Sequence, residues 1–366
     1  MGGAQFYHAR SSYKPLQLTM QLYNRFWTRR EIEARVGRIE QVGGLERRLG
    51  TEGPEAGMEF IQLRTGAGLA CRIIPSRGLD ISLAEFAGAP LSWLAGPGEP
   101  HPAFYEPQGL GWLRSFCGGL LSTCGLTQAG APGSDAGEAL GLHGRVNNLP
   151  ARQVVAEGNW HGDDYELRVA GVVEEVSVFG HHLRLRRELR ARLGENTLHL
   201  HDVVENAGFK PAPHMLLYHC NFGFPLLTGD TLLRCPAGRV VPRDAAAIMD
   251  GHDRWPAAPD PDFAERVYYH EDVVTKAGWA TATIEQPAFP VGAAHRPLAV
   301  RLSWKADTLP RFVQWKMPCA GTHVLGLEPA NCLVVGRAAE RAAGTLVTLA
   351  PGESRSYELR FEVVDL

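Results

Sequence analysis

Residues 357–363 read Tyr-Glu-Leu-Arg-Phe-Glu-Val, and this stretch near the C-terminus shows the pattern that decides the fold. Its apolar side chains occupy alternate positions, and charged side chains lie between them. Successive side chains of a β-strand point to opposite faces of the sheet. The stretch therefore predicts a strand with one buried face and one solvated face.

The same period of two recurs upstream, at residues 298–304 and 183–193. In the second of these stretches, leucine and alanine alternate with arginine and glutamate. An arginine-rich segment is a candidate for nucleic-acid binding. Here the alternation indicates instead that the arginines form the solvated face of a half-buried strand.

Turns are frequent along the chain, which contains 41 glycines and 25 prolines among its 366 residues. The clearest helix is predicted at residues 28–36, an amphipathic stretch without a strong cap. Strands and helices do not alternate regularly, so we predict an all-β fold, a large two-sheet antiparallel β-sandwich with few short helices. Residues 57–366 form this sandwich, and residues 1–56 form an N-terminal extension packed on it.

The charge balance and cysteine content exclude several classes of protein. The chain has 37 Lys and Arg against 40 Asp and Glu, so it lacks the basic excess that favours a nucleic-acid partner. No apolar run approaches the ~20 residues of a membrane span, and the N-terminus lacks the apolar segment of a secretory signal. The seven cysteines include no C-x-x-C pair, which argues against a disulfide framework or a zinc ribbon. We expect a cytoplasmic protein, and a homo-oligomer is compatible with the sequence.

Polar side chains interrupt apolar, glycine-rich surroundings in four segments. The first, at residues 141–150, reads Gly-Leu-His-Gly-Arg-Val-Asn-Asn-Leu-Pro and contains His143 and Arg145. Each hydroxyl of a sugar needs a hydrogen-bond partner, so such a dense polar lining suits a carbohydrate. The alternative interpretation is a solvated polar turn.

The second segment, at residues 213–225, reads Pro-His-Met-Leu-Leu-Tyr-His-Cys-Asn-Phe-Gly-Phe-Pro. Its apolar centre predicts a buried strand that delivers His219 and Asn221 at its end. Histidine titrates near neutral pH, so His219 is a candidate proton donor. A core histidine with satisfied hydrogen bonds is the alternative.

The third segment includes Gln314 and Lys316 and continues to Glu328, which ends an apolar stretch and precedes a proline. A buried carboxylate costs several kcal/mol unless it is paired or functional, and burial raises its pKa toward the range of a general base. In the fourth segment, Arg77 and Asp80 flank a glycine. This pair suits either a substrate site or a structural ion pair.

A metal site is a competing hypothesis. His199, His201 and Glu205 have the H-x-H-x₃-E spacing of cupin-type sites, and His214 follows them. Histidines two positions apart share one face of a strand. His199 and His201 also alternate with leucines, however, as ordinary outward-facing polar residues do. A cupin-type site in addition has a glycine-rich segment before its first histidine, and here only one glycine precedes the pair.

In their order, these segments resemble the aldose 1-epimerase (galactose mutarotase-like) superfamily. The closest resemblance is to a divergent branch in which R-G-L-D-I, L-H-G-R, N-F-G-F-P and G-L-E-P-A-N recur. It covers roughly residues 57–366. The resemblance implies a two-sheet sandwich with a small-molecule carbohydrate in a cleft. It also implies an isomerase that interconverts the anomers of an aldose or sugar derivative without a cofactor or metal.

The resemblance also implies a role for individual residues. In the superfamily, a glutamate takes the proton of the anomeric hydroxyl and a histidine protonates the ring oxygen, so the ring opens and recloses. These roles fall on Glu328 and His219, and His143 matches a second histidine that polarises the ring oxygen. Arg114, in W-L-R-S-F, matches a substrate-binding arginine. The further candidates for recognising sugar hydroxyls are Arg77, Asp80, Arg145, Asn221, His270, Gln314 and Lys316.

The sequence departs from typical mutarotases near these residues. The N-R-I motif is absent, His143 is followed by Gly-Arg, and His219 is followed by Cys-Asn-Phe. These changes remodel the pocket, so plain galactose or glucose is not the expected substrate. The superfamily also has a sugar-binding aspartate further along the sequence, and Asp272 is the candidate for it here. Two alternative functions are an isomerase or lyase acting on a keto or deoxy sugar, and a non-catalytic carbohydrate-binding protein on the same fold.

Overall fold

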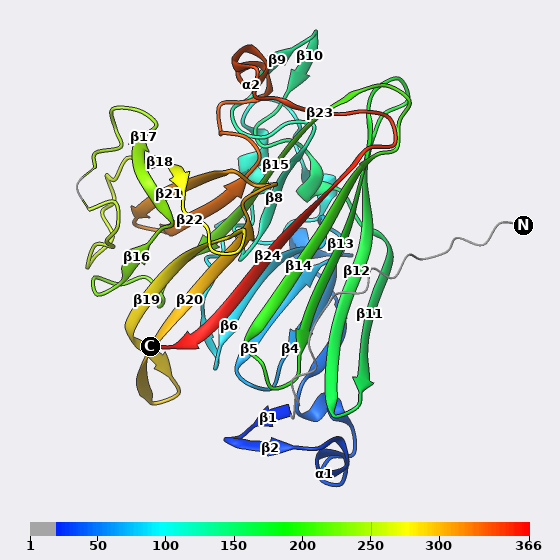
Figure 1. Ribbon diagram of the computed structural model, residues 1–366, viewed down its shortest axis with the longest axis vertical. Coiled ribbons are helices and arrows are strands. Elements are labelled where there is room, and N and C mark those ends of the chain that lie inside the picture. Colours follow the sequence, from blue (N-terminus) through cyan, green and yellow to red (C-terminus); the bar gives the residue numbers. More distant parts are fainter. Residues whose placement is uncertain (1–19, 250) are drawn as a thin grey trace, which may run out of the picture.

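The computed structural model describes residues 20–249 and 251–366, and layers of β-sheet make up most of it (Figure 1). One layer is an antiparallel sheet of eight strands. In spatial order the strands are β11 (Arg152–His161), β12 (Asp164–Val176), β13 (His182–Arg192), β14 (Thr197–Asn206), β24 (Ser354–Asp365), β20 (Ala294–Lys305), β19 (Trp279–Val291) and β16 (Leu232–Arg234).

The second layer combines two sheets. The seven-stranded sheet contains β17 (Ala237–Pro242), β18 (Arg266–Val273), β21 (Arg311–Cys319), β22 (Thr322–Ala330), β15 (Ala212–Phe222) and β23 (Val347–Leu349), and β8 (Ser122–Leu126) also pairs with β15. The five-stranded sheet contains β3 (Gly44–Leu49), β4 (Glu59–Arg64), β5 (Leu69–Ile74), β6 (Asp80–Phe86) and β7 (Ala89–Pro90). The predicted two-layer β-sandwich is therefore confirmed.

The other elements of the described chain are short. Two small hairpins are formed by β1 (Met20–Leu22) with β2 (Arg25–Trp27) and by β9 (Gly133–Asp135) with β10 (Glu138–Leu140). The α-helices are α1 (Arg29–Glu33) and α2 (Arg337–Ala343). The 3₁₀ turns are η1 (Ile39–Gln41), η2 (Gly53–Glu55), η3 (Pro102–Phe104), η4 (Gly111–Arg114) and η5 (Val146–Asn148).

Helix α1 lies where the sequence predicts a helix, but the expectation of a weak cap is wrong. The Thr28 side chain accepts a hydrogen bond from the backbone N–H of Glu31, and the Glu31 carboxylate accepts one from the backbone N–H of Thr28. This reciprocal capping box satisfies two backbone donors that a helix start otherwise leaves unpaired.

Residues 1–19 of the predicted N-terminal extension lie outside the described residues. Within the remainder of that extension, β3 pairs with β4 residue by residue and forms an edge of the five-stranded sheet. The division of the chain at residue 56 stays a prediction.

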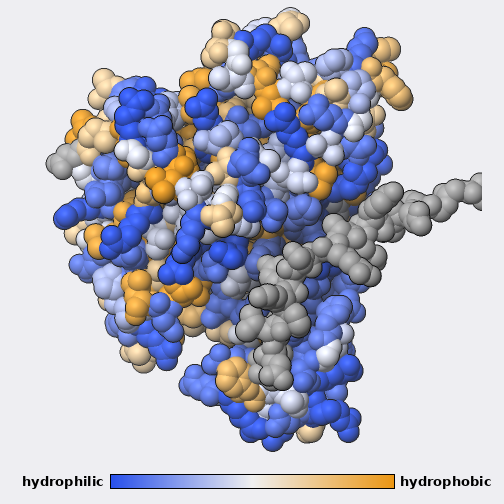
Figure 2. Space-filling view, in the orientation of Figure 1, coloured by the Kyte–Doolittle hydropathy of each residue, from blue (hydrophilic) through white to orange (hydrophobic). Residues whose placement is uncertain are grey.

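The alternation predicted for residues 183–193 is observed on β13. Leu185 and Leu189 are fully buried, and Arg184 and Arg186 on the outer face form ion pairs with Glu205 of β14. Hydrophilic residues cover most of the face seen in Figure 2, where hydrophobic residues form small separate groups.

Arg187 is the exception on β13, because it shares the inward face with the leucines and is only 2% exposed. Its guanidinium lies 2.6 Å from a carboxylate oxygen of Asp80 on β6 and 2.7 Å from one of Asp202 on β14. The Tyr218 hydroxyl of β15 donates a hydrogen bond to Asp202. This buried cluster ties the eight-stranded sheet to the opposite layer.

Within residues 20–249 and 251–366, no helix has the length and apolar character needed to cross a membrane.

Candidate active site

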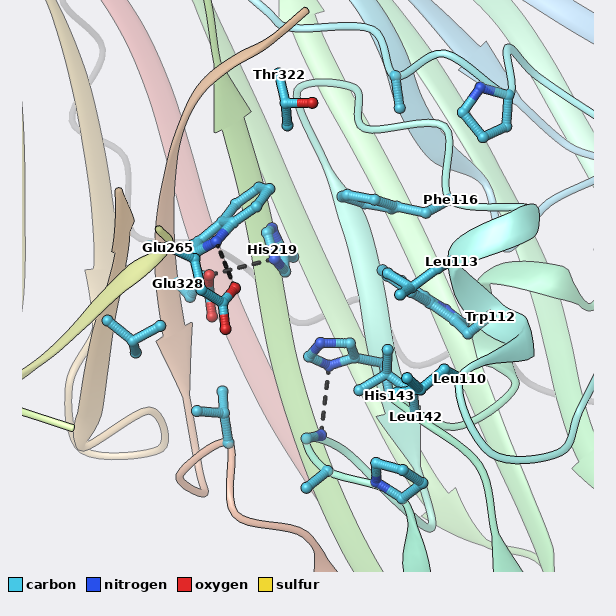
Figure 3. Close-up of a pocket in the computed structure, with 18 of the residues that line it drawn as sticks. Leu110, Trp112, Leu113, Phe116, Leu142, His143, His219, Glu265, Thr322 and Glu328 are labelled. Atoms are coloured by element: carbon cyan, nitrogen blue, oxygen red, sulfur yellow. Dashed lines mark hydrogen bonds and ion pairs between the residues drawn. The ribbon is translucent and has the colours of Figure 1, made fainter. Parts of the chain in front are cut away.

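A cavity of about 750 Å³ opens on one face of the seven-stranded sheet. Strands β15, β18, β21 and β22 form one wall. The chain segments around η4 and around His143 form the other wall, and both walls appear in Figure 3. The volume falls within the range of pockets that bind small molecules.

Neighbouring strands place His219 and Glu328 side by side in this cavity. Cys220 of β15 pairs with Leu327 of β22, so the next position on each strand sets His219 opposite Glu328. Nε2 of His219 lies 3.3 Å from Oε1 of Glu328. The two side chains are 7% and 3% exposed, so little solvent reaches the contact.

Burial favours the uncharged form of both groups. It raises the pKa of Glu328 to about 8, the negative charge of Glu265 adds to this increase, and Arg243 opposes it. Burial lowers the pKa of His219 to about 3, with a further lowering from His143 and an opposing effect of the Asn221 side chain. At neutral pH the pair therefore shares one proton, which resides on Glu328.

His143 faces the same cavity as a hydrogen-bond donor. The backbone N–H of Gly130 donates to Nδ1 of His143 over 3.3 Å, and burial of the ring lowers the pKa of His143 to about 4. The neutral ring must then carry its proton on Nε2. The His143 and His219 ring centroids lie 5.8 Å apart, so this N–H group is close to the His219–Glu328 pair.

The backbone around His143 explains the glycine that follows it. Gly144 has a φ of +75°, and a Cβ atom at that position would lie 2.2 Å from the carbonyl oxygen of Gln128. Only glycine fits such a close approach of two backbone segments. The His-Gly pair thus sets the position of the imidazole in the cavity.

Comparisons with known proteins show the sequence family and the fold of the chain. Residues 55–363, most of the chain, match the sequence family described as Domain of unknown function (DUF4432). The chain belongs to the DUF4432 family. A search among curated proteins finds no significant match.

Solved structures place this DUF4432 chain among mutarotase-like folds. A "putative aldose 1-epimerase" from Klebsiella pneumoniae subsp. pneumoniae is 25% identical with a TM-score of 0.80, and the match covers 89% of this chain and 86% of the Klebsiella chain. A galactose mutarotase-like protein from Clostridium acetobutylicum is 14% identical with a TM-score of 0.60, covering 89% and 100%. Galactose 1-epimerase from Lactobacillus acidophilus is 13% identical with a TM-score of 0.56, covering 88% and 98%. The resemblance to aldose 1-epimerases and the galactose mutarotase-like sandwich are confirmed.

Two charged residues that line the cavity were not predicted from the sequence. Glu265, just before β18, accepts hydrogen bonds from Nη2 of Arg243 over 2.9 Å and from Nε1 of Trp315 over 3.1 Å. Both Glu265 and Arg243 line the cavity. Arg243 directly follows β17 and Glu265 directly precedes β18, where no apolar run marks a residue as facing a site.

Aromatic side chains surround the His219–Glu328 pair. The ring centroids of Phe116 and Trp315 each lie 5.4 Å from that of His219. Trp112 stacks on Phe116 at 4.4 Å and lies 4.7 Å from His143. Aromatic faces suit the C–H groups of a sugar ring, and these rings also shield the pair from water.

The eight predicted substrate-binding residues do not line this cavity. Arg77 is buried and donates hydrogen bonds to the carbonyls of Asn147 and Pro100, and Asp80 belongs to the Arg187 cluster. Asn221 is also buried and donates to the carbonyl oxygens of Gly119 and His219.

Gln314 and Lys316 lie on the face of β21 opposite to the cavity, because Trp315 between them faces it. Gln314 hydrogen-bonds His270 and the carbonyl of His252, and Lys316 donates to the carbonyls of Gly251 and Arg254. These side chains hold the segment between β17 and β18. His270 and Asp272 line a second cavity of about 200 Å³.

Two predicted arginines are exposed. Arg114 at the end of η4 is 74% exposed and pairs with Glu106 over 3.4 Å. Arg145 is exposed, and its backbone N–H donates to the carbonyl of Gly125.

The histidines of the competing metal hypothesis do not converge. His214 hydrogen-bonds the carbonyl of Leu126 and the hydroxyl of Tyr357, and Glu205 pairs with arginines of β13. Among the residues that the structure describes, no three His, Cys, Asp or Glu side chains are grouped to bind a metal ion.

Proposed function

We propose that this protein is an enzyme that interconverts the anomers of a free sugar or sugar derivative, as an aldose 1-epimerase does. The observation that carries the proposal is the buried contact of 3.3 Å between His219 and Glu328 in the cavity wall. Opening a hemiacetal needs one group that accepts a proton and one that donates it. This pair supplies both within reach of a single ligand.

The roles of proton acceptor and proton donor follow from the one proton that Glu328 and His219 share. Transfer of this proton from Glu328 to Nε2 of His219 produces a carboxylate base and an imidazolium acid without changing the net charge of the pair. The carboxylate then takes the proton of the anomeric hydroxyl while the C1–O5 bond breaks, and His219 protonates the ring oxygen O5. Rotation about C1–C2 and the reverse transfers give the other anomer, and the shared proton then returns from His219 to Glu328.

His143 supports the same step as a fixed donor. Its Nε2–H group points into the cavity with a tautomer set by the Gly130 backbone. A donor held in place before the reaction stabilises the charge that develops on the ring oxygen. The chemistry needs only proton transfer, so no cofactor takes part.

The test is exchange spectroscopy by NMR, which measures the rate of anomer exchange for a panel of aldoses above the spontaneous rate. We expect Glu328→Gln and His219→Asn each to lower the enzymatic rate by at least 100-fold, the usual contribution of a general acid or base. The control is Glu157→Gln, at an exposed position on β11. Normal exchange in both active-site variants would overturn the proposal.

The same samples separate the alternative functions. In deuterated water, anomer exchange leaves the carbon-bound hydrogens of the sugar in place. Incorporation of deuterium at carbon would instead assign Glu328 to proton removal from carbon, as in an isomerase or lyase on a keto or deoxy sugar. Sugar binding without any rate acceleration would assign a carbohydrate-binding role.

A further inference from the structure

The two walls of the cavity differ in chemistry. The strand wall holds Glu265, Glu328, His219 and Arg243. The opposite wall holds Leu110, Leu113 and Leu142, and we call these three residues the leucine wall. Figure 3 shows Leu110 and Leu113 on the side of the cavity opposite to Glu265 and Glu328.

Two of the three side chains of the leucine wall are exposed, and the wall is preformed. Leu110 and Leu113 are 60% and 49% exposed, although both line the cavity. The stacked rings of Trp112 and Phe116 lie at 4.4 Å and anchor η4, and the backbone N–H of Leu142 donates to the carbonyl of Gly109. A rigid, exposed apolar surface in a binding pocket gains free energy when a ligand covers it.

The charge of the cavity excludes anionic sugars. Among the described residues, Arg243 is the arginine or lysine that lines this cavity. Its guanidinium is already bound to two carboxylates, Asp244 at 2.7 Å and Glu265 at 2.9 Å. A phosphate or carboxylate on the ligand would therefore meet no unpaired positive charge and would face the charge of Glu265.

The size of the cavity points in the same direction. Its volume of about 750 Å³ lies in the upper part of the range for drug-sized ligands, which is more than a single hexose ring fills. A hexose placed against the acid–base pair would leave the leucine wall uncovered. Sugar hydroxyls turned toward that wall would find no hydrogen-bond partner among its leucine side chains, whereas an apolar substituent there would bury apolar surface.

We propose that the substrate is a neutral free sugar that carries an apolar substituent away from its anomeric centre. The hemiacetal lies against Glu328 and His219, and the substituent covers Leu110 and Leu113. This inference rests on the proposed function, because it places the reacting end of the sugar at the acid–base pair.

The test compares matched ligands by calorimetry on the intact protein. The parents are glucose and galactose, and the derivatives are their 4-O- and 6-O-butyl ethers, their 6-phosphates, glucuronate and galacturonate. A buried methylene group contributes about 0.8 kcal/mol, or about fourfold in Kd. We expect at least one butyl ether to bind at least tenfold more tightly than its parent, and the anionic derivatives to bind no better than the parents.

A double variant tests the location of the substituent. Leu110→Asn with Leu113→Asn changes two exposed side chains, so the fold should tolerate it. We expect this variant to remove most of the tenfold gain in affinity of the butyl ether over its parent sugar. The matched control is Leu49→Asn, a leucine that is 65% exposed on β3 and outside the cavity.

The outcomes separate this inference from the proposed function. If the parent sugars bind and exchange anomers but the ethers gain nothing, or if the gain persists in the leucine variant, the apolar substituent is wrong and the function stands. Tighter binding of a phosphate or uronate would also overturn the inference. If no compound of the panel binds, sugar binding itself is wrong, and the inference falls with it.

Discussion

Gly326 and Glu328 lie two positions apart on β22, and the absence of a side chain at Gly326 makes room for the carboxyl group of Glu328. A Cβ atom at position 326 would lie 2.8 Å from Oε1 of Glu328, 3.0 Å from Cβ of Trp315 and 3.2 Å from Cε1 of His219. The glycine of the G-L-E-P segment therefore belongs to the geometry of the acid–base pair.

We expect Gly326→Ala to displace Glu328 from His219 and to lower anomer exchange by at least tenfold. Overpacking of this kind also costs about 1–3 kcal/mol of folding stability. The control is Gly133→Ala on β9, where a Cβ atom would meet nothing within 4 Å. Exchange NMR together with urea denaturation checks both effects. Full activity in Gly326→Ala would show that the site tolerates a shifted carboxyl group.

The pH dependence of exchange should report the proton shared by the pair. Glu328 has a pKa of about 8, so above this pH the pair loses the proton that Glu328 would pass to His219, and no imidazolium acid can form. We expect the enzymatic rate, after subtraction of the spontaneous rate, to be constant at neutral pH and to fall above about pH 8. A rate that keeps rising above pH 8 would contradict the shared proton.

Glu265 and Arg243 should shift the pH above which the rate falls, and they should shift it in opposite directions. The charge of Glu265 raises the pKa of Glu328, and the charge of Arg243 lowers it. In Glu265→Gln the fall in rate should begin at lower pH, and in Arg243→Met at higher pH, with a few-fold change in rate near pH 8. Salt should weaken both shifts, because Glu265 is half exposed. Identical profiles would mean that neither charge acts on Glu328.

Buried histidines should make the fold sensitive to acid. His214 and His270 have a pKa of about 4 and His219 of about 3, all below the usual 6.5. As the pH falls below about 6.5, the unfolded chain binds protons that the folded chain does not, so the free energy of unfolding decreases. Glu328 opposes this between pH 4.5 and 8, because there the folded state holds the extra proton.

Three histidines outweigh one carboxyl group, so the net slope is expected to be positive. From pH 6 to 5 the free energy of unfolding should fall by at least about 1.4 kcal/mol, the value for one proton per pH unit. Urea denaturation at several pH values measures this slope, and His270→Gln should reduce it. A flat profile would mean that these rings accept protons in the folded state.

The strands, and the three residues of the candidate site that the structure brings into one cavity, each have a local signature in the sequence. Period-two alternation marks β13 and β24, and polar residues at the ends of apolar runs mark His219 and Glu328. His143 is marked by its neighbouring glycine, which the backbone geometry requires. None of these predictions needs knowledge of which strands pair.

The rest of the site depends on strand pairing and on the face to which a side chain points. Gln314 and Lys316 were predicted in the site, but Trp315 faces the cavity and its two neighbours therefore cannot. Glu265, Arg243 and the leucine wall come from sheet edges and connecting segments. Their convergence is produced by the fold and leaves no pattern in the sequence.

Arg187 and Arg190 on β13 provide a final prediction, because the same alternation places them on opposite faces. Arg187 is buried between Asp80 and Asp202, and Arg190 is 45% exposed beside Glu166 and Glu188. Removing one partner of a buried ion pair leaves an uncompensated charge and costs about 3–5 kcal/mol, whereas exposed pairs contribute about 0–1 kcal/mol. We therefore expect Arg187→Met to lower the free energy of unfolding by several kcal/mol and Arg190→Met to leave it nearly unchanged. Urea denaturation of the two variants at pH 7 makes the comparison, and equal stabilities would mean that the buried cluster does not hold the two layers together.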